Sequence, residues 1–472
     1  MRSEIRQAIS SVDSGGQLSP QRLINGYPEL QPPESGAKSN LAVYGSPGIS
    51  DWTTIGTGPI RGFTAMNGVG YVVSGQEFYS FNSAGTATLL GAGITGIAPV
   101  SIDNNGFEIV IVNGELGFSY LEASTSFTQI GDADFQRCNT VTCINNIFAY
   151  DWKDTNKFFL SEILDGRTYD ALSFASAESN PDRVRAVRNR KGILFIFGET
   201  TIEAWDHTGA YNFPFQRFKG GTIGRGLRAP LAIEEEDEAL FFLGDDLVMY
   251  RLSGLQIRRV STHALEKTWA KFTTTEDAFC FKVIYGGHKF IYLTFPTEGR
   301  TYGFDIAANN LWHERMSFDA TGADVKWRAN ASINIFNKTL VGDANSGRIG
   351  LLDPETYTEF GDPIVTTLVF PNYHANGRRC IMNWFEADME VGVGATSGQG
   401  VNPQIMLTWS NDGGKTYVPF VESLPIGRRG EYGTIVKWDR LGEFYQRVMK
   451  VSVSDPVERV FHSFRADMDI DD

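Results

Sequence analysis

Ser410-Asn-Asp-Gly-Gly-Lys-Thr-Tyr417 is the segment of this sequence that comes closest to a motif with known chemistry. It is an Asp-box, the S-x-D-x-G-x-T-aromatic hairpin that occurs in sialidases and in many other β-proteins. The carboxylate of Asp412 can accept hydrogen bonds from backbone N–H groups of the turn, the glycines supply positive φ angles, and Tyr417 can pack back onto the sheet. A sialidase needs several such boxes, three convergent arginines and a Tyr–Glu nucleophile pair. One box alone therefore favours a self-satisfied turn.

Two runs of like charge could bind ions or charged partners. The five acids Glu234-Glu-Glu-Asp-Glu238 could hold a cation or supply a carboxylate pair for acid–base chemistry. Adjacent acids repel each other, so a solvated turn is the default interpretation, and a wall facing an acidic lumen or a neighbour's basic patch is the alternative. For the densest basic cluster, a solvated edge is the default and a contact with an acidic neighbouring subunit is the alternative. That cluster consists of Arg183, Arg185, Arg188, Arg190 and Lys191.

The remaining reactive side chains have no catalytic or metal-binding spacing. Gly220-Gly-Thr-Ile-Gly-Arg-Gly226 lacks the Lys-Ser/Thr ending of a phosphate-binding P-loop and opens no helix, so we interpret it as a flexible connection. The cysteines show no Cys-x-x-Cys and are predicted to be buried free thiols, and the histidines are dispersed. We predict no catalytic, cofactor-binding or metal-binding residues, and no cofactor. The residues concerned are Cys138, Cys143, Cys280, Cys380, His207, His263, His288, His313, His374 and His462.

The elements that position these residues follow a repeat. A strand, a Gly, Asn or Asp turn, a second hydrophobic strand and an outer strand return seven times, with a period of roughly 36 to 50 residues. Continuous apolar runs such as 193–197 (ILFIF) and 239–243 (ALFFL) predict strands buried on both faces, whereas alternating runs predict one solvated face. The copies begin near Arg61, Ile97, Cys138, Val184, Arg228, Phe279 and Trp327.

This period is typical of a β-propeller blade, whose four strands bury their faces only when neighbouring blades stack on them. The content of 50 Gly, 33 Phe and 17 Tyr also fits a turn-rich β-protein. We predict an all-β fold, a β-propeller of about seven blades followed by a C-terminal β-sandwich. Six or eight blades remain open, because the third and sixth copies have longer loops. The best helix signal is Ser261–Phe272, which opens on hydroxyl N-cap candidates.

Three regions are expected along the chain. Residues 1–40 are rich in Ser, Gly, Pro and Gln, with the linker Gln31–Lys38, and predict an extended arm that packs on something else. Residues 41–361 form the propeller, and the orphan strand Asn40–Ile49 is expected to close it by pairing with the last blade, within a closing segment of about residues 41–57. Residues 362–472 contain longer strands separated by Gly-rich connections, which favours the sandwich.

The net charge of −14 argues against holding DNA by its phosphates, since that requires a basic patch. It is compatible with a solubility role, and also with a repulsive wall along which DNA slides without binding. The N-terminal sequence MRSEIRQAIS is too polar for a signal peptide, and no run approaches ~18 apolar residues. We therefore expect synthesis in the host cytoplasm and no membrane-spanning segment.

An ordered set of short strings adds a family resemblance. It consists of Ser46-Pro-Gly-Ile49, Ala177-Glu-Ser-Asn-Pro-Asp182, Leu194-Phe-Ile-Phe-Gly198, Thr201-Ile-Glu203, Thr208-Gly-Ala210 and the segment from Ser261 to Trp269. Together these strings resemble the packaged-DNA stabilisation proteins of short-tailed bacteriophages (podoviruses), also called tail accessory, tail hub or nozzle proteins. The resemblance runs from about residue 41 to about residue 355, and more loosely to the C-terminus.

The resemblance implies a structural protein of the virion tail that is not an enzyme. Such proteins form a homo-oligomer, a hexameric ring, below the portal and its adaptor ring. They retain packaged double-stranded DNA, conduct it during ejection without sequence-specific binding, and contact tail spikes or fibres and a central needle or plug protein. Subunit contacts are expected from the N-terminal arm and the C-terminal sandwich, because a closed propeller offers few free edges.

Two rival functions stay open from the residues themselves. The lone Asp-box is compatible with a propeller-based glycan hydrolase of sialidase type, and a propeller is equally compatible with a glycan-binding lectin or host-surface adhesin. Oligomeric state discriminates among them, because a nozzle protein should form a ring with a central channel.

Overall fold

The structure is a computed structural model that describes residues 2–5, 11–12, 20–30, 39, 41–177, 180, 182–210, 213–308, 311–319, 321–419 and 421–471. The linker Gln31–Lys38, and Glu178, Ser179 and Pro181 of the family resemblance, lie outside these residues. Within the described ranges the regular secondary structure is almost entirely β-strand, with one helix, α1 (His263–Trp269). The side chain of Thr262 caps α1 by accepting a hydrogen bond from the backbone N–H of Leu265. The all-β prediction is confirmed.

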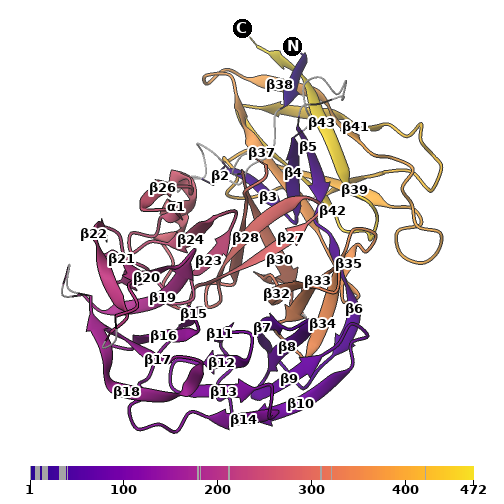
Figure 1. The fold of residues 1–472 in the computed structure, drawn as a ribbon. Helices are drawn as coiled ribbons and strands as arrows, with labels where there is room; N and C mark the ends of the chain where they lie inside the picture. Colours follow the sequence, from indigo (N-terminus) through magenta and orange to yellow (C-terminus); the bar gives the residue numbers. More distant parts are fainter. Residues whose placement is uncertain are drawn as a thin grey trace.

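Antiparallel four-stranded units follow one another around a central axis, as Figure 1 shows, and form a β-propeller. We number the units as blades in chain order. Blade one consists of β7 (Ile60–Met66), β8 (Val69–Ser74), β9 (Glu77–Phe81) and β10 (Ala87–Ala92). Blade two consists of β11 (Ser101–Asn104), β12 (Glu108–Val112), β13 (Gly117–Leu121) and β14 (Ser126–Gln129). Blade three consists of β15 (Val141–Ile144), β16 (Ile147–Trp152), β17 (Lys157–Glu162) and β18 (Asp165–Ser176).

Blade four consists of β19 (Val184–Arg190), β20 (Ile193–Gly198), β21 (Ile202–His207) and β22 (Phe215–Ile223). Blade five consists of β23 (Ile233–Glu236), β24 (Ala239–Leu243), β25 (Met249–Ser253) and β26 (Gln256–Arg259). Blade six consists of β27 (Phe279–Tyr285), β28 (His288–Phe295), β29 (Arg300–Asp305) and β30 (Leu311–Phe318). Blade seven is β32 (Ala329–Ile335), β33 (Lys338–Asp343), β34 (Arg348–Asp353) and β6 (Gly48–Thr54).

The second strand of each blade is the most buried, because both of its faces pack against neighbouring blades. All five residues of β24 are buried, as are all five of β12. The core of the ring is therefore a series of inter-blade clusters. One of them joins Phe197 of blade four to Phe242 of blade five, whose rings lie 5.4 Å apart between centroids.

An early strand closes the ring, but it is shorter than expected. The strand β6 pairs antiparallel with β34, from Gly48 opposite Asp353 to Thr54 opposite Arg348. The preceding strand, β5 (Leu41–Gly45), pairs instead with β4 (Gly26–Leu30) and with β43 (Val460–Ile470). The expectation that the whole of Asn40–Ile49 closes the propeller is thus wrong for Leu41–Gly45, because Ser46 and Pro47 turn the chain from one sheet into the other.

The segment 20–30 also belongs to the chain's own sheets. β3 (Pro20–Ile24) lies between β30 of blade six, with which it is parallel, and β37 (Thr366–His374), with which it is antiparallel. One continuous sheet therefore extends from blade six into the C-terminal region. These residues are therefore part of the chain's own sheets and not a separate extended arm, because both edges of β3 are already paired within the chain. A contact of the N-terminal region with a neighbouring subunit stays a prediction.

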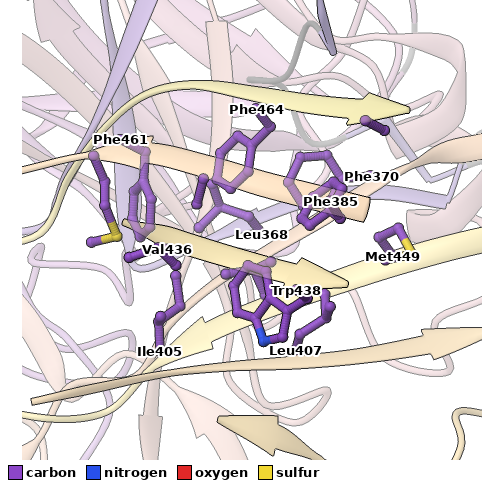
Figure 2. Close-up of a cluster of buried hydrophobic side chains, with 14 of the residues drawn as sticks. Leu368, Phe370, Phe385, Ile405, Leu407, Val436, Trp438, Met449, Phe461 and Phe464 are labelled. Atoms are coloured by element: carbon purple, nitrogen blue, oxygen red, sulfur yellow. The ribbon is translucent and has the colours of Figure 1, made fainter. Parts of the chain in front are cut away.

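The C-terminal region consists of two facing sheets. One has the order β4-β5-β43-β38-β41, and the other continues from β3 in the order β37-β42-β39-β40. Figure 2 shows their shared core, in which Phe385 and Phe464 of the first sheet face Leu368 and Phe370 of the second. The strands not yet bounded are β38 (Cys380–Met389), β39 (Gln404–Ser410), β40 (Glu422–Pro425), β41 (Val436–Phe444) and β42 (Gln446–Val453).

Short strands complete the sheets at their margins. β1 pairs with β43, β2 with β3, β31 with β30, and β35 with β6 and β36. Their bounds are β1 (Arg2–Ile5), β2 (Ser11–Val12), β31 (Asp324–Lys326), β35 (Thr358–Glu359) and β36 (Asp362–Pro363). In the part of the chain that the structure describes, no helix is long and apolar enough to cross a lipid bilayer.

Candidate functional site

The Asp-box forms a turn that satisfies its own carboxylate. Oδ1 of Asp412 accepts hydrogen bonds from the backbone N–H groups of Lys415 and Thr416, both at 2.9 Å, and from the hydroxyl of Ser410 at 2.5 Å. Oδ2 accepts the hydroxyl of Thr416 at 2.6 Å. The hydrogen bonds from Ser410 and then Thr416 hold the pKa of Asp412 well below its usual range. A carboxylate held in this way is a structural anchor and a poor general acid.

A groove of about 550 Å³ lies beside this turn, on the outer face of the sheet formed by β3, β37, β42 and β39. Tyr417 lines it, and the Lys450 ammonium sits 4.4 Å from the centre of the Tyr417 ring. Arg22, Asp324 and Met406 also contribute to the lining. This groove is where a glycan would have to bind if the box marked a carbohydrate site.

The acidic run and part of the basic cluster neutralise each other. Lys191 of blade four lies with its Nζ 2.7 Å from Oε1 of Glu238 in blade five. Arg190 donates a hydrogen bond to the carbonyl oxygen of Glu238, and its Nε lies 3.7 Å from Oε1 of Glu235. The first hairpins of two adjacent blades are therefore joined by opposite charges.

Blade six supplies cations from the other side of the same acidic run. The Lys282 ammonium lies 3.6 Å from Oε2 of Glu236 and donates to the carbonyl oxygen of Glu235 at 3.0 Å. The Lys289 ammonium lies 3.2 Å from Oε1 of Glu236 and 3.3 Å from Oδ1 of Asp237. Burial opposes ionisation of Glu236, but the Asp237 backbone N–H and Lys289 outweigh it and lower its pKa. The run thus joins three blades through ion pairs, while Glu235, Asp237 and Glu238 stay exposed to solvent as its composition favours.

The basic cluster does not act as one patch. Arg185 pairs with Glu199 at 3.0 Å, and Arg188 lines the propeller axis. Arg183 is exposed and forms no ion pair within the described residues. Most of the positive charge that could have faced an acidic neighbour or DNA is consequently engaged inside the chain.

The axis of the propeller encloses a cavity of about 690 Å³, lined by the first strand of each blade. Its charged lining residues are three acids and three bases, namely Asp103, Glu234, Glu235, Arg61, Arg188 and Lys282. Burial raises the pKa of the Asp103 and Glu234 carboxyls and lowers that of the Arg188 guanidinium. A lining of this kind suits water and small polar solutes.

Gly220–Gly226 has a structural role. Gly220 has a φ of 74°, and a Cβ at Gly226 would lie 1.9 Å from the carbonyl oxygen of Glu199. The segment spans the end of β22 and the connection to blade five, where the Gly226 N–H donates to Oδ1 of Asp245 at 2.9 Å. The glycines allow close backbone approach between blades four and five, and no helix follows them.

The thiols and imidazoles do not gather. Cys138, Cys280 and Cys380 are buried and Cys143 is half-buried, all four as free thiols, and burial raises the pKa of Cys143 to about 12. Over the described ranges, no cluster of three His, Cys, Asp or Glu side chains could hold a metal ion.

The sequence did not predict the polar seam that lies between the propeller and the two C-terminal sheets. Asn25, fully buried with a φ of 55°, donates through Nδ2 to the carbonyl of Val365 at 3.1 Å and accepts the Met316 N–H at 2.9 Å. Nearby, His288 bridges Asp305 (2.7 Å) and Glu29 (2.6 Å). The dipeptide Asn25-Gly26 is a turn signal that could have indicated structure in this segment.

Several solved structures are weakly similar to the chain. No curated protein is significantly similar to the chain. The computationally designed Ika8 protein is 12% identical, with a TM-score of 0.36 over 64% of this chain and 99% of that one. The extracellular domain of BT4673, a putative one-component system of B. thetaiotaomicron, is 8% identical, with a TM-score of 0.43 over 80% of this chain and 47% of that one. PorZ of Porphyromonas gingivalis is 10% identical, with a TM-score of 0.38 over 73% of this chain and 44% of that one. The chain spans less than half the length of the last two.

A match to a protein-family model identifies the family of this chain. Residues 14–357 match the model of the Phage_stabilise family, described as Bacteriophage P22 Gp10, beta-propeller. The match covers all seven blades and includes the closing strand β6. The chain therefore belongs to this family of bacteriophage packaged-DNA stabilisation and tail proteins.

Proposed function

We propose that this chain is a tail nozzle or hub subunit of a short-tailed phage. It forms a ring, a hexamer, below the portal and adaptor, retains the packaged genome and conducts it during ejection. The family match over residues 14–357 carries this proposal. Spikes or fibres and a central needle or plug protein are its further expected partners, and the virion tail its location.

The dimensions of the propeller support a ring of several copies. A cavity of about 690 Å³ is the size of a small-molecule pocket. It cannot admit a DNA duplex, whose major groove alone is about 12 Å wide. In this proposal, DNA therefore passes through a lumen that several copies enclose together, and each propeller forms a solid part of its wall.

The charge distribution supports sliding of DNA along that wall. The chain carries a net charge of −14, and Arg185, Arg190 and Lys191 are already paired with carboxylates or carbonyls of the same chain. Where basic side chains are already paired, the surface has little to exchange for the counterions of DNA, so it repels the phosphates more than it retains them.

The proposed role is structural and not enzymatic. The single box carboxylate, Asp412, accepts hydrogen bonds from four donor groups of its own turn at distances of 2.5 to 3.0 Å. Catalysis of glycoside hydrolysis would need this group, or a pair of carboxyls near it, to be available to a substrate.

Particles that lack this chain test the proposal. They should package DNA and then lose it, and complementation with the full chain should restore retention. Electron microscopy of complete particles should find a ring of this chain on the portal axis. Retention of the genome without the chain, or a position away from the axis, would refute the role.

A further inference from the structure

An apolar patch lies exposed on blades two and three. Phe107 is 65% exposed in the turn between β11 and β12, and Ile163 and Leu164 are 64% and 52% exposed in the turn between β17 and β18. The two turns adjoin, because the Gly166 N–H donates to Oε2 of Glu108 at 2.7 Å. We call Phe107, Ile163 and Leu164 the turn patch. Three exposed large side chains so close together indicate a contact surface.

The surroundings of the turn patch are acidic. Glu162 and Asp165 flank Ile163 and Leu164 in sequence, and Glu122 accepts a hydrogen bond from Asn67 beside Phe107. Within the described part of the chain neither Glu162 nor Asp165 enters an ion pair, although Asp165 accepts hydrogen bonds from Arg167 N–H and the Thr168 hydroxyl. A partner for the patch should therefore combine apolar groups with positive charge.

The C-terminal sheets carry a loop of that chemistry. In residues 427–435, which we call the tip loop, Tyr432 is 76% exposed and Ile435 is 75% exposed. Arg428 and Arg429 are exposed, and across the described residues neither guanidinium is in an ion pair. Tyr and Arg are the residue types that most often dominate binding energy at protein interfaces.

The tip loop is held in shape before any partner arrives. The Arg428 N–H donates to Oε2 of Glu431 at 2.8 Å, and the Thr434 hydroxyl donates to the Glu431 carbonyl at 2.9 Å. The Gly430 N–H donates to the carbonyl of Gly392 in the neighbouring loop at 3.1 Å. A preformed loop loses little conformational entropy on binding, which favours its use as a contact.

The two surfaces lie on opposite sides of the molecule. In Figure 1, β41, which follows the tip loop, is at the upper right, whereas β12 and β17, which flank the turn patch, are at the lower left. A single chain cannot bring them together. Two copies can, and a contact between different surfaces of identical copies leads to a ring when its rotation closes.

We propose that the tip loop of one copy docks on the turn patch of the next, with Tyr432 and Ile435 on the apolar side chains and Arg428 and Arg429 facing Glu162 and Asp165. This contact would join neighbouring copies around the ring. The inference takes from the proposed function only the premise that the copies form a ring. Each copy uses one surface toward each neighbour.

Paired variants of the full chain test the contact in solution. The double variant Tyr432→Asp with Ile435→Asp removes the apolar groups of the tip loop. The double variant Ile163→Asp with Leu164→Asp removes apolar groups of the turn patch. Each variant should weaken assembly by about tenfold or more. Mixed one to one, the two variants should form a dimer and stop there, because one intact tip and one intact patch remain. Leu89→Asp, at an exposed apolar residue of β10, is the matched control and should assemble as the parent does.

Charge reversal gives a second readout. Arg428→Glu with Arg429→Glu should weaken assembly, and Glu162→Arg in the same chain should restore part of it. Melting temperatures of all variants should match the parent, since every substituted residue is exposed. Unchanged ring formation by the tip and patch variants would overturn the proposal.

Cross-linking in assembled particles decides the matter if the purified parent chain does not assemble alone. A chain with both Tyr432→Cys and Leu164→Cys should give a ladder of covalent oligomers on oxidation, whereas Tyr432→Cys with Leu89→Cys should not. A ring on the portal axis without the ladder would overturn this contact and leave the proposed function standing. Genome retention by particles that lack the chain would instead overturn the proposed function.

Discussion

Arg22 and Glu314 are joined by two parallel hydrogen bonds across the seam between the propeller and the C-terminal sheets. Nε of Arg22 donates to Oε1 of Glu314 at 3.0 Å, and Nη2 donates to Oε2 at 2.6 Å. Glu314 is buried on β30 of blade six, whereas Arg22 lies on β3, 292 residues earlier in the chain. This pair ties the N-terminal segment to the outer strand of a blade, and the attraction of Glu314 raises the pKa of Arg22.

Replacing Arg22 with Met should destabilise the fold by about 3 kcal/mol, because the Glu314 carboxylate stays buried but loses the two hydrogen bonds and the positive charge that Arg22 supplies. Urea unfolding measures this loss. The double variant Arg22→Met with Glu314→Gln should be more stable than the sum of the single effects predicts, since it leaves no uncompensated charge. Additive losses would mean that the two groups do not depend on each other.

His288 should make stability depend on pH at the same seam. Burial alone would lower its pKa, but hydrogen bonds to Asp305 and then Glu29 outweigh burial and raise it. The charged imidazolium therefore contributes stability that is fully present below its unfolded-state pKa of about 6.5 and is lost as the pH rises through the raised folded-state value.

The measurement compares melting temperatures of the parent and His288→Gln across a range from about pH 5.5 to pH 9. The parent should be more stable at the acidic end, and the difference should shrink at the alkaline end. His374→Gln, at an exposed position of β37, serves as the control and should track the parent. A gap between parent and His288→Gln that widens with rising pH would contradict the assignment.

Asp412→Ala should loosen the Asp-box turn. We expect no glycoside hydrolysis by the parent, so the variant should change stability and not activity. The backbone N–H groups of Lys415 and Thr416 lose their acceptor, so proteolysis within residues 410–419 should become faster and the melting temperature should fall. Asp412→Asn retains one acceptor oxygen and should have the smaller effect. Turnover of a sialoside by the parent, abolished in Asp412→Ala with the fold intact, would favour the hydrolase alternative.

The parts of the fold that local pattern encodes could be predicted, and those that depend on distant pairing could not. The run 239–243 predicted a strand buried on both faces, and β24 has all five residues buried, because inter-blade packing needs only a local apolar sequence. Leu41–Gly45 and Gly48–Thr54 read alike as short strands, yet they enter different sheets. Gly48–Thr54 pairs with β34, about 300 residues further along the chain, and Leu41–Gly45 pairs with β43, about 400 residues further along. No local signal specifies which of these distant strands each segment joins.

The candidate site shows the same division. The turn chemistry of Asp412 follows from residues within four positions, so it was predictable, and the structure has those hydrogen bonds. The pairing of Glu238 with Lys191 joins residues 47 apart on neighbouring blades. Each run was recognisable as charged, but their mutual neutralisation required knowing which blades stack side by side.

Neutralising the acidic run should turn the propeller into a DNA-binding protein. In the variant with Glu234→Gln, Glu235→Gln, Glu236→Gln, Asp237→Asn and Glu238→Gln, the cations of the flanking blades lose their acidic partners. Lys191, Lys282 and Lys289 then face solvent with unpaired charge beside Arg190. Such a patch releases counterions from DNA, so binding should appear at ~50 mM salt and fall steeply by ~200 mM.

Filter binding of a duplex of arbitrary sequence measures this effect, with the parent expected to show none. The control carries the same change in net charge at five acids of the C-terminal sheets, Glu422, Glu443, Asp467, Asp469 and Asp471, each replaced by its amide. Because these acids are not gathered around a basic cluster of the blades, the control should bind little DNA even though its net charge matches. Equal binding by both variants would show that total charge alone governs the repulsion of DNA. Binding by the acidic-run variant alone would show that the ion pairs between blades four, five and six keep this basic patch closed to DNA.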